Sequence, residues 1–218
     1  MNDSQRSFEI GRLIEEAKRH GPQHLETALQ MAEEIEDTDD KSSYIAIIAE
    51  TLATIGTLTD LERALQLGRT TKAIDKWVFA FRGVFARLMA ENDIDRALEI
   101  VGELELIAVK FETDDDYDNL TRSEIWDDIG DMYEKAGKIE HTRQKWANAV
   151  RWAQAGQNSS KIQEAVDCHK VLTRIARKFL KAGYAEDAIN TAHSITHGGF
   201  RNSALTAIAD WQSKPENK

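Results

Sequence analysis

Apolar residues recur at intervals of three and four along nearly the whole chain, and no stretch keeps the two-residue alternation typical of a half-buried strand. Only 2 of the 218 residues are proline. Proline is rare inside helices because it lacks the backbone N–H and clashes with the preceding turn. The spacing and the scarcity of proline together predict an all-α fold that is long enough to bury a hydrophobic core.

Glycines and polar cap residues divide the periodic pattern into segments. Gly21, Gly56, Gly137 and Gly183 stand where helices are expected to end, because glycine tolerates the left-handed conformation that often follows a helix. We therefore expect about eleven helices, at residues 5–20, 24–36, 41–55, 59–70, 73–91, 93–110, 120–136, 138–155, 159–182, 184–196 and 200–212.

Two long stretches of the chain resemble each other. They are WDDIGDMYEKAGKIEHTRQKWANA, which begins at Trp126, and LTRIARKFLKAGYAEDAINTAHSI, which begins at Leu172. Each has a small residue, an aromatic residue three positions later and a glycine four positions after that. These residues are Gly130, Tyr133 and Gly137 in the first stretch, and Ala176, Phe179 and Gly183 in the second. The small residue would allow a partner helix to approach closely.

The first of these stretches resembles the tetratricopeptide-repeat family. Trp126, Ile129, Gly130 and Tyr133 match the pattern W-x2-L-G-x2-Y with isoleucine in place of leucine. The chain departs from that pattern at Thr142, where other copies have alanine. The repeat spacing also varies, with steps of 36, 33, 45 and 46 residues between positions 28, 64, 97, 142 and 188.

The resemblance implies a right-handed superhelix of stacked helical hairpins. Residues 1–218 would form a single helical-repeat domain, with hairpins at about 5–36, 41–70, 73–110, 120–155 and 159–196 and a closing helix at 200–212. One hairpin cannot bury its apolar face alone, so each would pack on the next and leave a concave surface. A HEAT-like stack and an irregular helical bundle remain as alternatives.

Charge and composition argue against several classes of protein. A net charge of −10 disfavours nucleic-acid binding, which needs a basic face. The charge is uneven: residues 1–60 have 13 acids and 5 bases, whereas residues 126–218 have 11 acids and 14 bases. The first residues lack a secretory pattern, and no apolar stretch approaches the roughly 20 residues of a membrane span. We therefore expect a cytoplasmic protein that does not bind membranes.

Possible metal sites are incomplete. His193 and His197 are four residues apart and could share a helical face, and Cys168 and His169 lie one helix earlier. A structural zinc site needs four ligands and a catalytic site three, and a histidine in the last helical turn is already favoured by the helix dipole. We expect Cys168 to be a small buried side chain and expect no metal ion or other cofactor.

The acidic segment FETDDDYDNLTRSEI, residues 111–125, partly matches a calcium-binding loop. Asp114, Asp116 and Asp118 have the required spacing, but Asn119 replaces the glycine and Ile125 replaces the bidentate glutamate. We interpret this segment as a solvated loop that leads into a helix.

A basic stripe runs along the predicted helix 159–182. Lys170, Arg174, Arg177, Lys178 and Lys181 lie opposite the apolar face formed by Val171, Leu172, Ile175, Ala176 and Phe179. The tetratricopeptide resemblance implies that the first helix of each pair lines the groove. The binding residues would then be Lys170, Thr173, Arg177 and Lys181, with Asp127 and Asp131 on the preceding pair and Arg82 one pair earlier. The alternative is a solvated face with salt bridges between neighbouring pairs.

These features predict a non-catalytic scaffold, adaptor or chaperone-like protein that binds a protein or peptide with an acidic segment. The chain has no recognisable catalytic set and no glycine-rich phosphate loop. One alternative is a regulatory module that binds a small peptide or metabolite in the concavity. Two others are a metalloenzyme that uses His193, His197 and His169, and a self-associating structural module.

Overall fold

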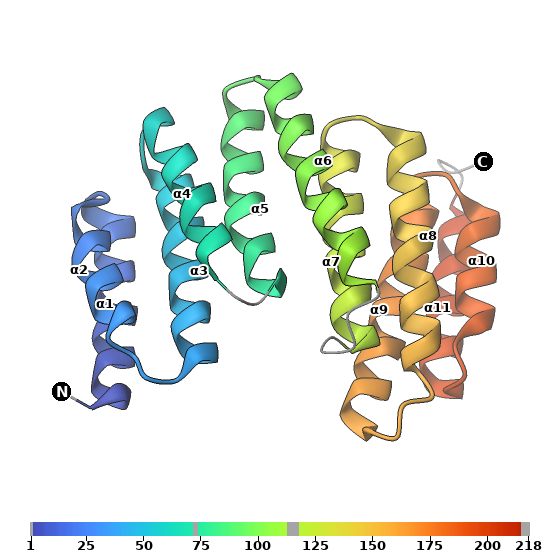
Figure 1. The fold of residues 1–218 in the computed structure, drawn as a ribbon. Coiled ribbons are helices and arrows are strands. Elements are labelled where there is room, and N and C mark those ends of the chain that lie inside the picture. The colour runs from blue at the N-terminus through green and yellow to red at the C-terminus, as the bar shows by residue number, and fades with distance from the viewer. Residues whose placement is uncertain (1, 72–73, 113–117, 215–218) are drawn as a thin grey trace. The chain divides into compact units, whose positions relative to one another are not determined.

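The computed structural model describes residues 2–71, 74–112 and 118–214 (Figure 1). These residues form helices and short connections, and none of them belongs to a strand. The helices are α1 (Asp3–His20), α2 (Gln23–Glu33), α3 (Thr38–Ile55), α4 (Leu58–Thr70), α5 (Ile74–Ala90), α6 (Ile94–Phe111), α7 (Asn119–Lys135), α8 (Ile139–Gly156), α9 (Ile162–Lys181), α10 (Ala185–Ser194) and α11 (Gly198–Ser213). The prediction of an all-α fold is confirmed, and each predicted helix boundary lies within about three residues of the observed one.

The chain forms two compact units, Met1–Ile107 and Ala108–Lys218, and the division falls within α6. In the first unit α3 packs against α1, α2, α4 and α5, and in the second α9 packs against α7, α8, α10 and α11. Each unit therefore has the solenoid-like arrangement in which helices pack on their neighbours in the chain. The single-domain organisation expected from the sequence stays a prediction.

Three helical hairpins share the same turn. In each, the residue that follows the turn donates its backbone N–H to a carbonyl oxygen five residues earlier, a pattern typical of glycine-terminated helices. These hydrogen bonds run from Asp93 to Leu88, from Lys138 to Tyr133 and from Tyr184 to Phe179. The preceding residue has a positive φ and is Asn92, Gly137 or Gly183. The expectation that Gly137 and Gly183 end helices is confirmed.

The core of the second unit is built around a close approach of α7 and α8 at Gly130. A Cβ placed on Gly130 would lie 2.4 Å from Cδ1 of Trp146, so only glycine fits beside the indole. Trp146 is fully buried and makes an edge-to-face contact with Phe179, with ring centroids 5.6 Å apart. The small residue in the repeated pattern therefore has the predicted role in helix packing.

The helix that follows α10 differs from the expectation in one respect. Helices were expected at 184–196 and 200–212, which leaves Gly198 and Gly199 between them, but these two glycines form the first turn of α11. The imidazole Nδ1 of His197 accepts a hydrogen bond from the backbone N–H of Gly199, at 3.2 Å, and so caps the new helix. The helix packs on α9 and α10 through buried Ala204 and Ile208, as expected for a closing helix.

Candidate functional site

Helix α9 separates apolar and charged residues sharply. Its apolar residues, including Leu172, Ile175 and Phe179, are buried against the neighbouring helices, whereas Lys170, Arg177 and Lys181 are exposed. The opposition of faces predicted from the sequence is confirmed. This segregation orients the helix and sets a row of cations on its outer side.

The outer side of α9 and the start of α11 form an open groove of about 620 Å³. Its lining residues are Lys170, Thr173, Arg174, Arg177, Lys178 and Lys181 of α9 and Phe200 and Ser203 of α11. Among the described residues that line it are five cations and no carboxylate. We call this the basic groove. All four α9 residues predicted to bind a partner line it, and their role in binding stays a prediction.

A second, acidic pocket of about 410 Å³ adjoins the basic groove. It is lined by Glu124, Asp127, Asp128 and Asp131 of α7, together with Arg174 and Lys178 of α9. Arg174 and Lys178 belong to both hollows and therefore form the boundary between them.

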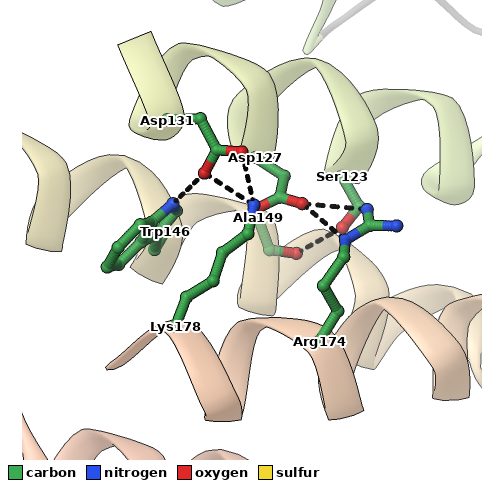
Figure 2. A network of polar contacts seen from close by, with 7 residues as sticks. All are labelled: Ser123, Asp127, Asp131, Trp146, Ala149, Arg174 and Lys178. Atoms are coloured by element: carbon green, nitrogen blue, oxygen red, sulfur yellow. Dashed lines mark hydrogen bonds and ion pairs between the residues drawn. The ribbon is translucent and has the colours of Figure 1, made fainter. Parts of the chain in front are cut away.

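An ion-pair network fills this boundary (Figure 2). Lys178 Nζ lies 2.8 Å from Oδ1 of Asp127 and 2.6 Å from Oδ1 of Asp131, and Arg174 Nη2 lies 2.8 Å from Oδ2 of Asp127. The indole N–H of Trp146 also donates to Asp131, at 3.1 Å. Asp127 and Asp131 were predicted to face a partner, but both are already paired with α9. The alternative of salt bridges between neighbouring helical pairs therefore holds for these two residues.

The network is partly buried. The side chain of Asp127 is only 5 % exposed, that of Lys178 is 21 % exposed and that of Arg174 is 49 % exposed. A carboxylate removed from water to this extent needs compensating charge and hydrogen bonds. Ser123, one helical turn before Asp127, donates its hydroxyl to the carbonyl oxygen of Ala149, at 2.7 Å, and so joins α7 to α8 beside the network.

Glu124 lies at the edge of the acidic pocket. Burial raises its pKa above the usual range of a glutamate. The positive charge of Arg174 lowers the pKa, and the carboxylates of Asp167, Asp118 and Asp127 raise it. With four carboxylates against two cations, the acidic pocket keeps a net negative charge beside the basic groove.

The other cations of the basic groove differ in their contacts. Lys170 Nζ pairs with Asp167, at 2.7 Å, and the hydrogen bond from Lys170 is the largest cause of the lowered pKa of that aspartate. Arg177 makes a long hydrogen bond of 3.4 Å to the Ser203 hydroxyl. Within the described residues, neither Arg177 nor Lys181 has a carboxylate partner. These two residues are the available charges of the groove.

Two further predicted binding residues have structural contacts. Thr173 is buried, and its hydroxyl donates to the carbonyl oxygen of His169 one turn earlier, at 2.8 Å. Arg82 belongs to the first unit, where its guanidinium pairs with Glu50 of α3 at 2.8 Å and lies 5.1 Å from the ring centroid of Phe79. The binding role assigned to Arg82 by the resemblance stays a prediction.

The groove also contains residues that the sequence did not point to. Phe200 and Ser203 enter the lining from α11. One signal of this pairing is present in the sequence. The two cations, Arg174 and Lys178, are four residues apart on α9, and the two aspartates, Asp127 and Asp131, are four residues apart on α7. From the sequence, Asp127 and Asp131 were placed on the groove, and salt bridges between neighbouring pairs were kept as the alternative.

The histidines do not form the cluster considered from their spacing. His193 is exposed in the last turn of α10, whereas His197 caps α11, so the two do not share a helical face. His197 instead approaches His169, with ring centroids 5.6 Å apart. The described part of the chain contains no group of three or more histidine, cysteine, aspartate or glutamate residues able to hold a metal ion.

Cys168 is buried, as predicted. A Cβ placed on Gly156 would lie 2.6 Å from its sulfur, so the thiol fills the space above a glycine of α8. Burial raises the pKa of Cys168 to about 12, and the thiol therefore stays protonated at neutral pH.

The calcium-loop interpretation falls partly outside the described residues, which do not include Asp114 and Asp116. Asp118 is described, and its carboxylate accepts a hydrogen bond from the backbone N–H of Thr121 at the start of α7, at 2.8 Å. It therefore acts as a helix cap.

Comparison with models of known protein families gave no match, and neither a search of curated proteins nor a search of solved structures gave a significant match. Within the described residues, no helix has the length and apolar character needed to cross a membrane.

Proposed function

We propose that this chain is a non-catalytic scaffold of the cytoplasm that binds a protein or peptide through the basic groove. We also propose that its helical hairpins are tetratricopeptide-like, as the pattern at Trp126, Ile129, Gly130 and Tyr133 suggests. In such arrays the first helix of each pair faces the ligand, and here that helix would be α9.

One observation carries the proposal. A protein with a net charge of −10 has a groove lined by five cations, and the described residues offer no carboxylate to Arg177 and Lys181. Exposed cations that lack an internal partner contribute little to folding, but they attract an oppositely charged partner and fix its orientation.

The groove supports an open binding surface better than the alternative of a regulator with a small-molecule pocket. Lys170, Arg177 and Lys181 are exposed along its length. Small ligands bind most often in concave sites that bury most of their surface among apolar side chains. Phe200 is the one aromatic residue among those that line the groove.

The test is charge reversal with a matched control. The variant Arg177→Glu/Lys181→Glu changes the groove, whereas Lys138→Glu/Lys161→Glu changes net charge equally at exposed N-cap positions of α8 and α9. A partner captured with the unmodified protein from an extract of the native host would be purified, and its affinity for each variant measured by calorimetry.

We expect the groove variant to bind at least about tenfold more weakly, because two charge-assisted contacts are lost. The control should bind like the unmodified protein, and the melting temperatures should report any folding defect. If both variants bound the partner with equal affinity, the basic groove would not be the binding site.

A further inference from the structure

Some cations of the basic groove are already paired with carboxylates of this chain, and this limits which ligands can bind there. Arg174 and Lys178 neutralise Asp127 and Asp131 across the boundary to α7. Lys170 is held by Asp167. Only Arg177 and Lys181 are left without a carboxylate within the described residues, and they stand on consecutive turns of α9.

The separation of these two cations sets the spacing of their ligands. Four residues of α-helix correspond to a rise of about 6 Å. In an extended chain, residues two apart lie on the same side and are about 6.6 Å apart. Two carboxylates separated by one residue would therefore reach Arg177 and Lys181 together.

The character of the lining favours an extended ligand over a helical one. A docked helix gains affinity by placing an apolar face in an apolar groove. Here the lining consists of seven polar or charged residues and Phe200, so its apolar surface comes from one ring and from the aliphatic stems of the cations. A docked helix would find no row of apolar side chains to match its own, whereas an extended segment can pair its acids with α9 and its backbone with the hydroxyl of Ser203.

The neighbouring pocket limits the length of the acidic run. The four carboxylates of α7 outnumber Arg174 and Lys178 in the acidic pocket, so a net negative charge is left where the basic groove ends. A long polyanion such as a nucleic-acid strand would be repelled there, whereas two carboxylates would not extend that far. A short acidic motif is therefore the better match.

Resting on the proposed function, we infer that the basic groove binds an extended protein segment carrying two acidic residues separated by one residue, with Arg177 and Lys181 as their partners. Ser203 and Phe200 of α11 form the opposite wall. The side of the segment nearest α7 should carry no further acid.

The inference is tested with capped octapeptides and the full-length protein. Three peptides have the same composition, with zero, one or three residues between their two glutamates, and a fourth has glutamines in place of the glutamates. Binding is measured by fluorescence anisotropy at low and moderate salt. A single-stranded oligonucleotide of matched charge is the comparison ligand.

We expect the peptide with one residue between its glutamates to bind at least about fivefold more tightly than the two peptides with other spacings. The glutamine peptide should bind most weakly. Arg177→Gln/Lys181→Gln should lose about tenfold or more of that affinity, whereas Lys138→Gln/Lys161→Gln should lose none. Neutral variants are used because Lys181 lies in the last turn of α9, where an acid would also oppose the helix dipole.

Equal affinity for the differently spaced peptides, or tighter binding of the oligonucleotide, would overturn the inference. The proposed function would survive that result if a captured partner still depended on Arg177 and Lys181. If peptide binding did not depend on glutamate spacing, and partner binding did not depend on Arg177 and Lys181, both the inference and the proposed function would be refuted.

Discussion

At the scale of single residues, Gly130 is a position where one added methyl group should destabilise the core. Gly130→Ala would place a methyl group 2.4 Å from the Trp146 ring, which is fully buried. We expect a net loss of about 1 to 2 kcal/mol of unfolding free energy, because overpacking costs about 1 to 3 kcal/mol and alanine returns up to about 1 kcal/mol in helix propensity.

The matched control is Gly11→Ala in α1. A methyl group there would meet nothing within 4 Å, so helix propensity alone should act. We expect a gain of about 0.5 to 1 kcal/mol. Urea denaturation of the two variants measures both effects, and equal shifts in one direction would refute the packing role of Gly130.

His169 is the residue whose protonation should affect stability. It is only 6 % exposed, and among the described residues its Nδ1 has no hydrogen-bond partner, while Nε2 lies 3.0 Å from the Thr196 hydroxyl. Burial lowers the pKa of His169, and the nearby His197 lowers it further. The folded state therefore favours the neutral imidazole.

The sign of the pH dependence follows from this lowered pKa. The stability from neutral His169 is present above the unfolded pKa of about 6.5 and is lost as the pH falls through the lower folded value. His169→Gln should therefore lose less unfolding free energy than the unmodified protein between about pH 7.5 and 5.5. His193→Gln, at an exposed position of α10, should follow the unmodified protein. Identical pH profiles for all three proteins would exclude this role of His169.

At the scale of helices, the α7–α9 contact depends on the ion-pair network of Figure 2. Lys178→Met removes the cation shared by Asp127 and Asp131. We expect a cost of about 3 kcal/mol, near the lower end for a buried pair, because Asp127 keeps only the half-exposed Arg174. Arg174→Gln should cost less than about 1 kcal/mol, since that guanidinium is well hydrated.

A double-mutant cycle measures the interaction energy between Asp127 and Lys178 separately from their contacts with other residues. In Asp127→Asn/Lys178→Met the unpaired buried charge is removed together with its partner, so part of the stability should return. Strict additivity of the two single substitutions in chemical denaturation would show that the network does not couple α7 to α9.

At the scale of the whole molecule, the division at residues 107 and 108 predicts that the second unit can fold alone. A fragment of residues 108–218 keeps Glu112, whose carboxylate accepts the indole N–H groups of Trp126 and Trp152, at 3.1 and 3.2 Å. We expect a helical circular dichroism spectrum and one cooperative thermal transition.

A shorter fragment, residues 118–218, is the control. It lacks Glu112, and an unpaired N–H on buried Trp126 should cost about 1 to 3 kcal/mol. Its melting temperature should therefore be lower. A fragment of residues 108–218 without a cooperative transition would show that the second unit needs the rest of the chain.

Much of the secondary structure and part of the site could be predicted from the sequence. The eleven helices, the turns at Gly137 and Gly183 and the two faces of α9 follow from local spacing. The closing helix was predicted to begin at residue 200, two residues after the observed start at Gly198, because the cap supplied by His197 cannot be recognised from spacing.

The sequence by itself determined where the helices lie and which face of α9 is apolar, because periodicity and capping act within a few residues of one another. Only the tertiary structure decided which charges remain available. Arg174 and Lys178 meet Asp127 and Asp131, while Arg177 and Lys181 do not, although all four cations belong to one stripe. The reason is that ion pairs between helices depend on the relative rotation and height of α7 and α9, and those are set by the packing of the whole core.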